Sequence, residues 1–336
     1  MNQKMLSINP RRVAVYTEFD RCGDGVEQLL PDNWKLNNER KVNDLSQKSK
    51  NRLRDTLSWL VLCSAKRNVK LSDGKFIKNF QISFVTLTLP TKQMHSHKEI
   101  KSHCLNLFLQ NLRKKFAVKN YIWKAELQKN GNIHFHLSFD KPIHYMVIRR
   151  YWNLAIEKLG YVSAYANQMK DLSFEEYCYW QRQNGQTDTA KMKGSYNYGN
   201  STRWSSPNTT DIKSVKNIKN WASYMAKYMT KEPANKDKTG IIADSYDELI
   251  GRLWFCSTSL SRLKNVKIKF EINHYSFLAI MKKAKNSFEV VSDWCRLIFF
   301  DPKSLPFRVR ETVRDWLFMH AVKTGYEFPA HFPKFV

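Results

Sequence analysis

The chain has 336 residues, of which 42% are hydrophobic and 13% aromatic. This composition is ordinary for a globular protein and argues against wholesale disorder. Its 56 lysines and arginines outnumber its 30 aspartates and glutamates, which gives a formal net charge of +26. So large an excess indicates a polyanionic partner, because cationic side chains release the counterions that are condensed on phosphates. Of the two common polyanions, the composition favours nucleic acid over a membrane surface.

The sequence shows no sign of membrane insertion. A transmembrane helix needs roughly 18–20 apolar residues, and the best apolar run here covers only residues 57–63. The amino terminus has no signal-peptide pattern, and the six cysteines form no C-x-x-C pair. No zinc ribbon or disulfide framework is therefore expected. We expect a protein of the cytoplasm, with reduced thiols and no membrane partner.

The N-terminal segment, residues 1–78, is predicted to be basic and to contain one amphipathic helix. Residues 1–40 are polar and interrupted by prolines and glycines, which predicts irregular structure. From residue 43 to about residue 66, the leucines recur at helical spacing. This helix could lie on DNA or on the protein core.

Residues 79–272 carry the pattern of an α+β domain. Alternating, β-branched residues predict strands, and apolar residues three or four apart predict helices. Lys129-Asn130-Gly131 is a hairpin signal, and Gly160 is a candidate helix cap. The predicted elements are a strand at 82–89, a helix at 97–116, strands at 121–127 and 133–139, a helix at 145–159, and short strands at 253–256 and 266–272. Neighbouring strands break the rhythm of a doubly wound parallel fold, so we predict a central antiparallel sheet with flanking helices.

Three further segments complete the prediction. Residues 181–210 are rich in small polar residues and poor in large aliphatics, which predicts a long polar loop insert. Asp211 is then predicted to cap a helix that runs to about Lys231. The C-terminal residues 273–336 are predicted to form a mainly helical extension. Their basic, tryptophan-containing composition fits either duplex binding or packing onto the preceding domain.

A pair of histidines is the first candidate site. His134 and His136 lie two apart on a predicted strand, so both imidazoles project from one face and could bind a divalent metal. If residues 129–131 form a three-residue loop, Glu126 lies opposite His134 and Lys124 opposite His136. A two-residue turn would instead place Glu126 on the other face. Two histidines and one carboxylate would leave coordination positions open, which suits catalysis, with Mg²⁺ or Mn²⁺ as the expected ion.

A pair of tyrosines is the second candidate site. Tyr224 and Tyr228 are four residues apart near the end of a predicted helix, so their phenols share one face. An apolar stripe elsewhere on this helix is complete without them. A phenolate is a competent nucleophile at phosphorus and forms a covalent phosphotyrosine. Lys227 and Lys231 could hold phosphates or ease ionisation of the phenols, and Lys124 is a further candidate phosphate contact.

Three motifs follow one another along the chain and resemble those of a known family. They are FVTLTLP at 84–90, the segment from Glu126 to Leu137 with its two histidines, and YMAKY at 224–228. In this order they resemble the motifs of HUH-superfamily rolling-circle replication initiators, in particular the two-tyrosine Rep endonucleases of small single-stranded DNA phages. The similarity covers about residues 80–260. It includes the later segment GRLW at 251–254, while the polar stretch 181–210 departs from the pattern.

This resemblance implies a function. It implies an HUH endonuclease-like fold and a strand-specific nicking and joining enzyme that acts on single-stranded origin DNA of a phage or plasmid. Nicking would leave a 5′-phosphotyrosine and a free 3′-OH. The sequence contains no G-x-x-x-x-G-K-[ST] motif, so a host helicase and a host DNA polymerase are the expected partners, in the cytoplasm of a bacterial cell. The alternatives are a plasmid relaxase or transposase of the same superfamily, or a non-catalytic protein that binds single-stranded nucleic acid.

Overall fold

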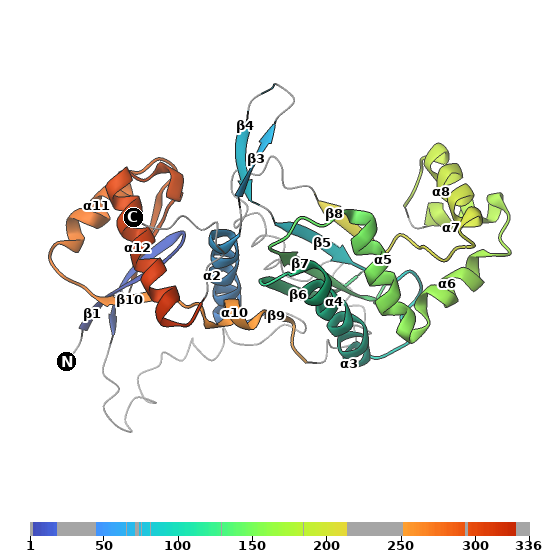
Figure 1. Cartoon of the computed structure of the whole chain (residues 1–336). Coiled ribbons are helices and arrows are strands. Elements are labelled where there is room, and N and C mark those ends of the chain that lie inside the picture. Colours follow the sequence, from blue (N-terminus) through green and yellow to red (C-terminus); the bar gives the residue numbers. More distant parts are fainter. Residues whose placement is uncertain are drawn as a thin grey trace, which may run out of the picture. The chain divides into compact units, whose positions relative to one another are not determined.

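The structure, a computed structural model, describes residues 3–18, 45–64, 66–70, 74, 76–80, 82–128, 130–183, 185–213, 251–292 and 295–326. These residues divide into two compact units. The first unit contains described residues of 3–80 and 256–326, and the second those of 82–213 and 251–255. Each unit carries a five-stranded antiparallel sheet with helices (Figure 1), which confirms the predicted α+β fold class. Within the described residues, no helix is both long enough and apolar enough to cross a membrane.

The second unit is built on a sheet with the strand order β8-β5-β7-β6-β9. Its strands are β5 (Ser83–Leu87), β6 (Tyr121–Leu127), β7 (Ile133–Phe139), β8 (Thr210–Lys213) and β9 (Trp254–Cys256). The central strand β7 pairs antiparallel with β5 on one side and with β6 on the other. The strands predicted at 82–89, 121–127, 133–139 and 253–256 are confirmed.

Helices cover one face of this sheet. They are α3 (His97–Glu99), the π-helical turn η2 (Ile100–Leu105), α4 (Asn106–Phe116), α5 (Tyr145–Ile156) and the 3₁₀ turn η3 (Glu157–Leu159). Phe135 of β7 is buried among them and packs against Trp152 of α5. Gly160 ends the last helix in the left-handed conformation, as predicted. Because alternate residues of a strand point to opposite faces, His134 and His136 project from the face that these helices leave uncovered.

The loop that joins β6 and β7 fixes the register of this hairpin. Gln128 N donates to Asn132 O at 2.8 Å, and Gly131 N donates to Gln128 O at 2.9 Å. Gly131 has a φ of +82°, the left-handed conformation that closes a three-residue hairpin loop. Glu126 consequently pairs with His134, and Lys124 with His136. The three-residue loop is confirmed, and the two-residue turn is excluded.

The stretch 181–210 is largely helical, so the prediction of a polar loop was wrong. It follows α6 (Tyr161–Met169) and α7 (Phe174–Gln183), and it contains α8 (Thr189–Ser201). The Asp188 side chain caps α8, and Met192 and Tyr196 pack with Trp204 in a small core of their own. A Cβ atom at Gly199 would clash with the Trp204 ring, which explains a glycine inside this helix. Composition concealed the helix because its few apolar residues serve this separate core.

The expected helix cap at Asp211 was also wrong. Asp211 lies in β8 and pairs with Thr86 of β5. Hydrogen bonds to the edge of the sheet satisfy the backbone here, and they prevail over the local capping preference of the side chain. The rest of the predicted helix, including Tyr224 and Tyr228, lies outside the described residues.

The first unit combines strands from both ends of the chain in the order β10-β1-β2-β12-β11. Its strands are β1 (Gln3–Asn9), β2 (Arg12–Glu18), β10 (Val266–Lys269), β11 (Phe288–Val291) and β12 (Cys295–Phe299), with a separate hairpin of β3 (Lys66–Lys70) and β4 (Phe76–Phe80). Its helices are α2 (Gln47–Cys63), α10 (Thr258–Arg262), α11 (His274–Lys283), η4 (Pro302–Ser304) and α12 (Phe307–Lys323). The irregular structure expected for residues 1–40 was wrong at β1 and β2, which are held by strands far away in sequence.

Helix α2 confirms the helix predicted near residues 43–66, and its apolar face lies in the protein core. Leu53, Leu57 and Leu60 are buried. On the same helix, Asp55 pairs with Arg12 at 2.9 Å and accepts a hydrogen bond from Asn265 Nδ2 at 3.1 Å. Burial raises the pKa of Asp55, while the charge of Arg12 opposes that shift. This ion pair connects α2 to the β1–β2 turn.

Replacing Gly131 tests whether the loop conformation stabilises the hairpin. No atom lies within 4 Å of a Cβ built at Gly131, so Gly131→Ala introduces backbone strain without a clash. We expect the free energy of unfolding to fall by about 1 kcal/mol, and by less in Gly131→Asn, because asparagine tolerates this conformation better. Urea denaturation measures both values.

The matched control is Gly194→Ala in α8, where φ is ordinary and the space is equally open. It should leave the protein as stable as before or stabilise it by roughly 0.5–1 kcal/mol. Equal effects of the two alanine substitutions would show that the left-handed conformation of Gly131 costs nothing to replace.

Candidate metal centre

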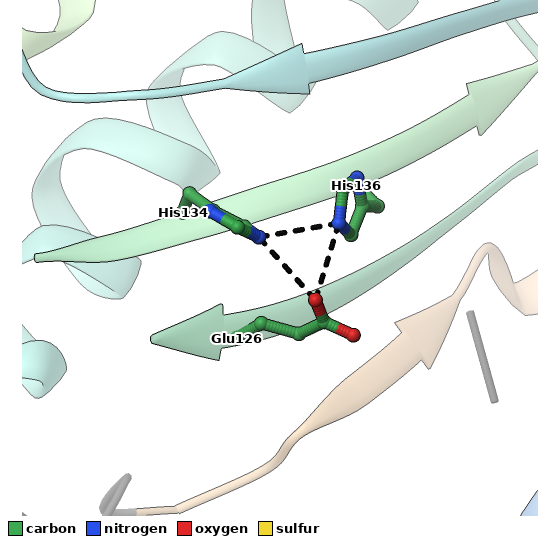
Figure 2. A group of neighbouring side chains, drawn as sticks. All are labelled: Glu126, His134 and His136. Carbon is green, nitrogen blue, oxygen red and sulfur yellow. Dashed lines mark hydrogen bonds and ion pairs between the residues drawn. The ribbon is translucent and has the colours of Figure 1, made fainter. Parts of the chain in front are cut away.

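Three side chains converge on the uncovered face of the second unit's sheet. His134 Nε2 and His136 Nε2 are 3.2 Å apart, and Glu126 Oε2 lies 3.4 Å from the former and 3.3 Å from the latter (Figure 2). Both histidines come from β7, and the glutamate comes from β6. The hairpin register brings them together, since residues directly opposed on two strands share a face.

This group could hold a metal ion. One ligand atom from each residue lies within 4.8 Å of the others, and no further group of this kind occurs among the described residues. The side chains are 15%, 14% and 26% exposed for His134, His136 and Glu126, so a small ion can reach them. Two imidazole nitrogens and one carboxylate oxygen form a donor set suited to Mn²⁺ or another divalent ion, with positions left for further ligands.

Neighbouring side chains orient His136. Thr86 Oγ1 lies 3.1 Å from His136 Nδ1, and these two residues pair directly between β5 and β7. With the proton on Nδ1 donated to the threonine hydroxyl, the lone pair of Nε2 faces the other two ligands. The Phe84 ring stacks against the imidazole with the centroids 5.8 Å apart. The sequence prediction missed Thr86, although the strand alternation 84, 86, 88 places it on the histidine face.

Lys124 has a different position from that expected of a phosphate contact. Its side chain is 4% exposed, and its ammonium forms an ion pair with Glu126 Oε1. The two carboxylate oxygens therefore have separate partners, Oε1 the lysine and Oε2 the histidines. A direct contact between Lys124 and phosphate stays a prediction. In this structure the lysine orients Glu126.

The electrostatics of the group favour the protonation states that bind metal. Burial alone would raise the pKa of Glu126, but hydrogen bonds from His134 and His136 and the charge of Lys124 outweigh it. The pKa of Glu126 is therefore held well below its usual range. Burial lowers the pKa of His136, and its hydrogen bond to Glu126 opposes that shift. At neutral pH the glutamate is thus ionised and His136 is neutral, as metal ligation requires.

The remaining candidate residues are not described by the structure. Tyr224, Tyr228, Lys227 and Lys231 all lie outside the described residues. Their arrangement relative to Glu126, His134 and His136 stays a prediction from the sequence.

Comparison with known families links this part of the chain to DNA replication. The family of replication-associated proteins of the ORF2 type matches residues 82–233, a span that includes Glu126, His134 and His136 and also the segment with Tyr224 and Tyr228. The match indicates a role in DNA replication and a DNA partner, in agreement with the charge of the chain. No curated protein and no solved structure shows a significant match.

Metal binding should be measurable as stabilisation. An ion that binds only the folded state at 100 times its dissociation constant raises the free energy of unfolding by about 2.7 kcal/mol. We expect Mn²⁺ to produce such a rise, EDTA to reverse it, and His134→Gln to abolish it. His103→Gln, at an exposed histidine of η2, is the control that should keep the full response. Isothermal titration calorimetry with Mn²⁺ gives the affinities directly, and equal affinities of wild type and His134→Gln would refute the site.

Thr86 should affect this affinity without binding the ion. Thr86→Val keeps the side-chain shape but removes the partner of His136 Nδ1. Loss of such a supporting hydrogen bond typically weakens metal binding by roughly 10–100-fold. Thr86→Ser should restore the affinity, because it restores the hydroxyl. The same calorimetric titration compares the three proteins, and wild-type affinity in Thr86→Val would mean that the hydrogen bond has no role.

Proposed function

We propose that the protein is a strand-specific DNA endonuclease and ligase that initiates rolling-circle replication. The observation that carries this proposal is the convergence of Glu126, His134 and His136 within the part of the chain that matches a replication-associated family. The net charge of +26 supports a DNA substrate. The site of action proposed is single-stranded origin DNA in the cytoplasm of a bacterial host.

Glu126, His134 and His136 would hold Mg²⁺ or Mn²⁺. When bound, such an ion polarises the non-bridging oxygens of the scissile phosphate and stabilises negative charge at the leaving oxygen. Two neutral imidazoles and a single carboxylate leave a bound divalent ion with net positive charge, so a phosphate oxygen is a favourable additional ligand. Lys124 keeps the Glu126 carboxylate ionised and oriented by its ion pair.

Tyr224 and Tyr228 are the proposed nucleophiles. The phenolate oxygen of one tyrosine forms a bond to phosphorus, and the bond between phosphorus and the 3′-oxygen breaks. The leaving oxygen takes up a proton and becomes the free 3′-OH from which a host polymerase can extend, while the 5′-phosphate remains on the tyrosine. Attack by the second tyrosine on the displaced strand allows a second cleavage, and the stored phosphotyrosine bond allows rejoining. Lys227 and Lys231 are proposed to hold phosphates, with a host helicase unwinding the duplex.

A plasmid relaxase and a transposase share this chemistry and differ in the DNA that they serve. Cleavage of origin DNA compared with transposon-end DNA distinguishes them. A non-catalytic protein that binds single-stranded nucleic acid is the alternative from another class. For that protein, replacing both tyrosines by phenylalanine would change no activity.

A covalent adduct with labelled single-stranded origin DNA tests the proposal. We expect wild type to form an adduct that survives denaturing electrophoresis and requires Mn²⁺ or Mg²⁺. Tyr224→Phe combined with Tyr228→Phe should remove it, whereas each single variant should lose only one of the two transfers. Tyr179→Phe, at a tyrosine that is 67% exposed on α7, is the control and should react as wild type does. An adduct that persists in the double variant would exclude these tyrosines as nucleophiles.

A further inference from the structure

A cavity lies in the second unit, away from the metal centre. Its volume is about 580 Å³, and α5, α6, α8 and the loop that follows α8 line it. Ile148 and Trp152 of α5 face the sheet, whereas Arg149, Arg150 and Leu154 of the same helix line the cavity. The cavity therefore opens on the side of α5 that faces away from the sheet.

The cavity carries positive charge without an internal counterion. Arg149 and Arg150 line it, and in the part of the chain that the structure describes neither forms an ion pair. Arg149 Nε is buried and has no hydrogen-bond partner, while its guanidinium lies 5.7 Å from the Tyr145 ring centroid. A buried donor without a partner is costly, so a ligand that accepts its hydrogen bond would be favoured.

The acidic residue in the cavity wall has other partners. Glu157 Oε2 accepts hydrogen bonds from Val162 N at 3.0 Å and Ser163 N at 2.9 Å, and Oε1 accepts one from the Ser163 hydroxyl. The carboxylate thus caps the start of α6. Its charge is directed at the helix terminus and not at the arginines.

Exposed apolar and aromatic side chains complete the lining. Tyr198 of α8 is 48% exposed, Leu154 is 52% exposed and Met146 is 56% exposed. Guanidinium groups next to an exposed aromatic ring match the two parts of a nucleotide. A phosphate can accept paired hydrogen bonds from arginine, and a base can stack on tyrosine.

The position of the cavity relates it to the sheet edge. Ser205 and Ser206 line it, and the chain continues from them into the edge strand β8. Asn153 of α5 fastens this connection, because its side chain donates to Pro207 O and accepts from the Thr209 hydroxyl. A DNA strand that leaves the histidine face around β8 would therefore meet the cavity.

We propose that this cavity binds a nucleotide of single-stranded DNA outside the cleavage site, with Arg149 and Arg150 on phosphate and Tyr198 against the base. This inference rests on the proposed function in that the substrate is single-stranded DNA. The cavity helps to hold the strand and takes no part in the chemistry. An acidic peptide is the competing ligand, and it predicts no effect of these residues on DNA affinity.

Fluorescence anisotropy with a labelled single-stranded oligonucleotide tests the inference on the full chain. Arg149→Gln with Arg150→Gln should weaken binding at least tenfold and reduce the slope of log affinity against log salt by about 1.4, which is 0.7 for each of two phosphates. Tyr198→Ala should weaken binding roughly 5–100-fold, the range for loss of one stacked base, while Tyr198→Phe should bind as wild type does. Arg149→Lys with Arg150→Lys keeps the charge and should lose less affinity than the glutamine pair.

The controls are matched in chemistry and lie outside the cavity lining. Arg113→Gln with Lys114→Gln removes two adjacent exposed cations of α4, and Tyr179→Ala removes an exposed ring of α7. Both should leave the affinity and the salt slope unchanged. An affinity in the Arg149/Arg150 and Tyr198→Ala variants equal to that of wild type would overturn the inference, and so would equal losses in the control variants.

Two further measurements separate the possible outcomes. A mononucleotide that displaces the oligonucleotide from wild type but not from Tyr198→Ala supports a nucleotide-sized site, whereas equal displacement from both proteins counts against it. The covalent-adduct assay on wild type reports on the proposed function independently of affinity. No adduct together with weakened binding in the cavity variants would refute the nicking function alone. An adduct together with unchanged affinities would refute the cavity inference alone.

Discussion

The hairpin of β6 and β7 determines which side chains can meet on the uncovered face of the sheet. Side chains alternate between faces along a strand, so a shift of one residue in the pairing would move Glu126 to the helix-covered core and leave the histidines without a carboxylate. The loop closed by Gly131 sets this register, and the buried residues Ile133 and Phe135 hold it from the other side. Local backbone geometry and core packing thus act on the same choice.

Within that register, the charges around Glu126 are arranged in sequence across the sheet. Lys124 contacts one carboxylate oxygen, the histidines contact the other, and Thr86 contacts His136 from β5. Three neighbouring strands therefore contribute to a group whose ligands number only three. Such a supported arrangement limits the motion of the imidazoles, which reduces the entropy lost when an ion binds.

The parts of this structure that the sequence predicted are those fixed by local pattern. Both strands of the hairpin, helix α5 and its glycine cap follow from the order of apolar residues, and so does the shared face of the histidines. Strands β1 and β2 were missed because their partners β10 and β12 lie more than 240 residues further along the chain. Helix α8 was missed for its polar composition, although Met192, Tyr196 and Gly199 recur at helical spacing. The cavity beside α5 depends on that helix, so no local pattern could reveal it.

The first unit's sheet has a consequence for how the chain is made. Strand β2 lies between β1 and β12, and β12 is synthesised only after the whole second unit. During synthesis the second unit can close its own core, while β2 still presents an open edge to solvent. Contacts so distant in sequence also slow folding, because a long loop must be closed before they form. The order of strands therefore makes the unit that carries the metal ligands the earlier one to mature on the ribosome, with the flanking sheet completed last.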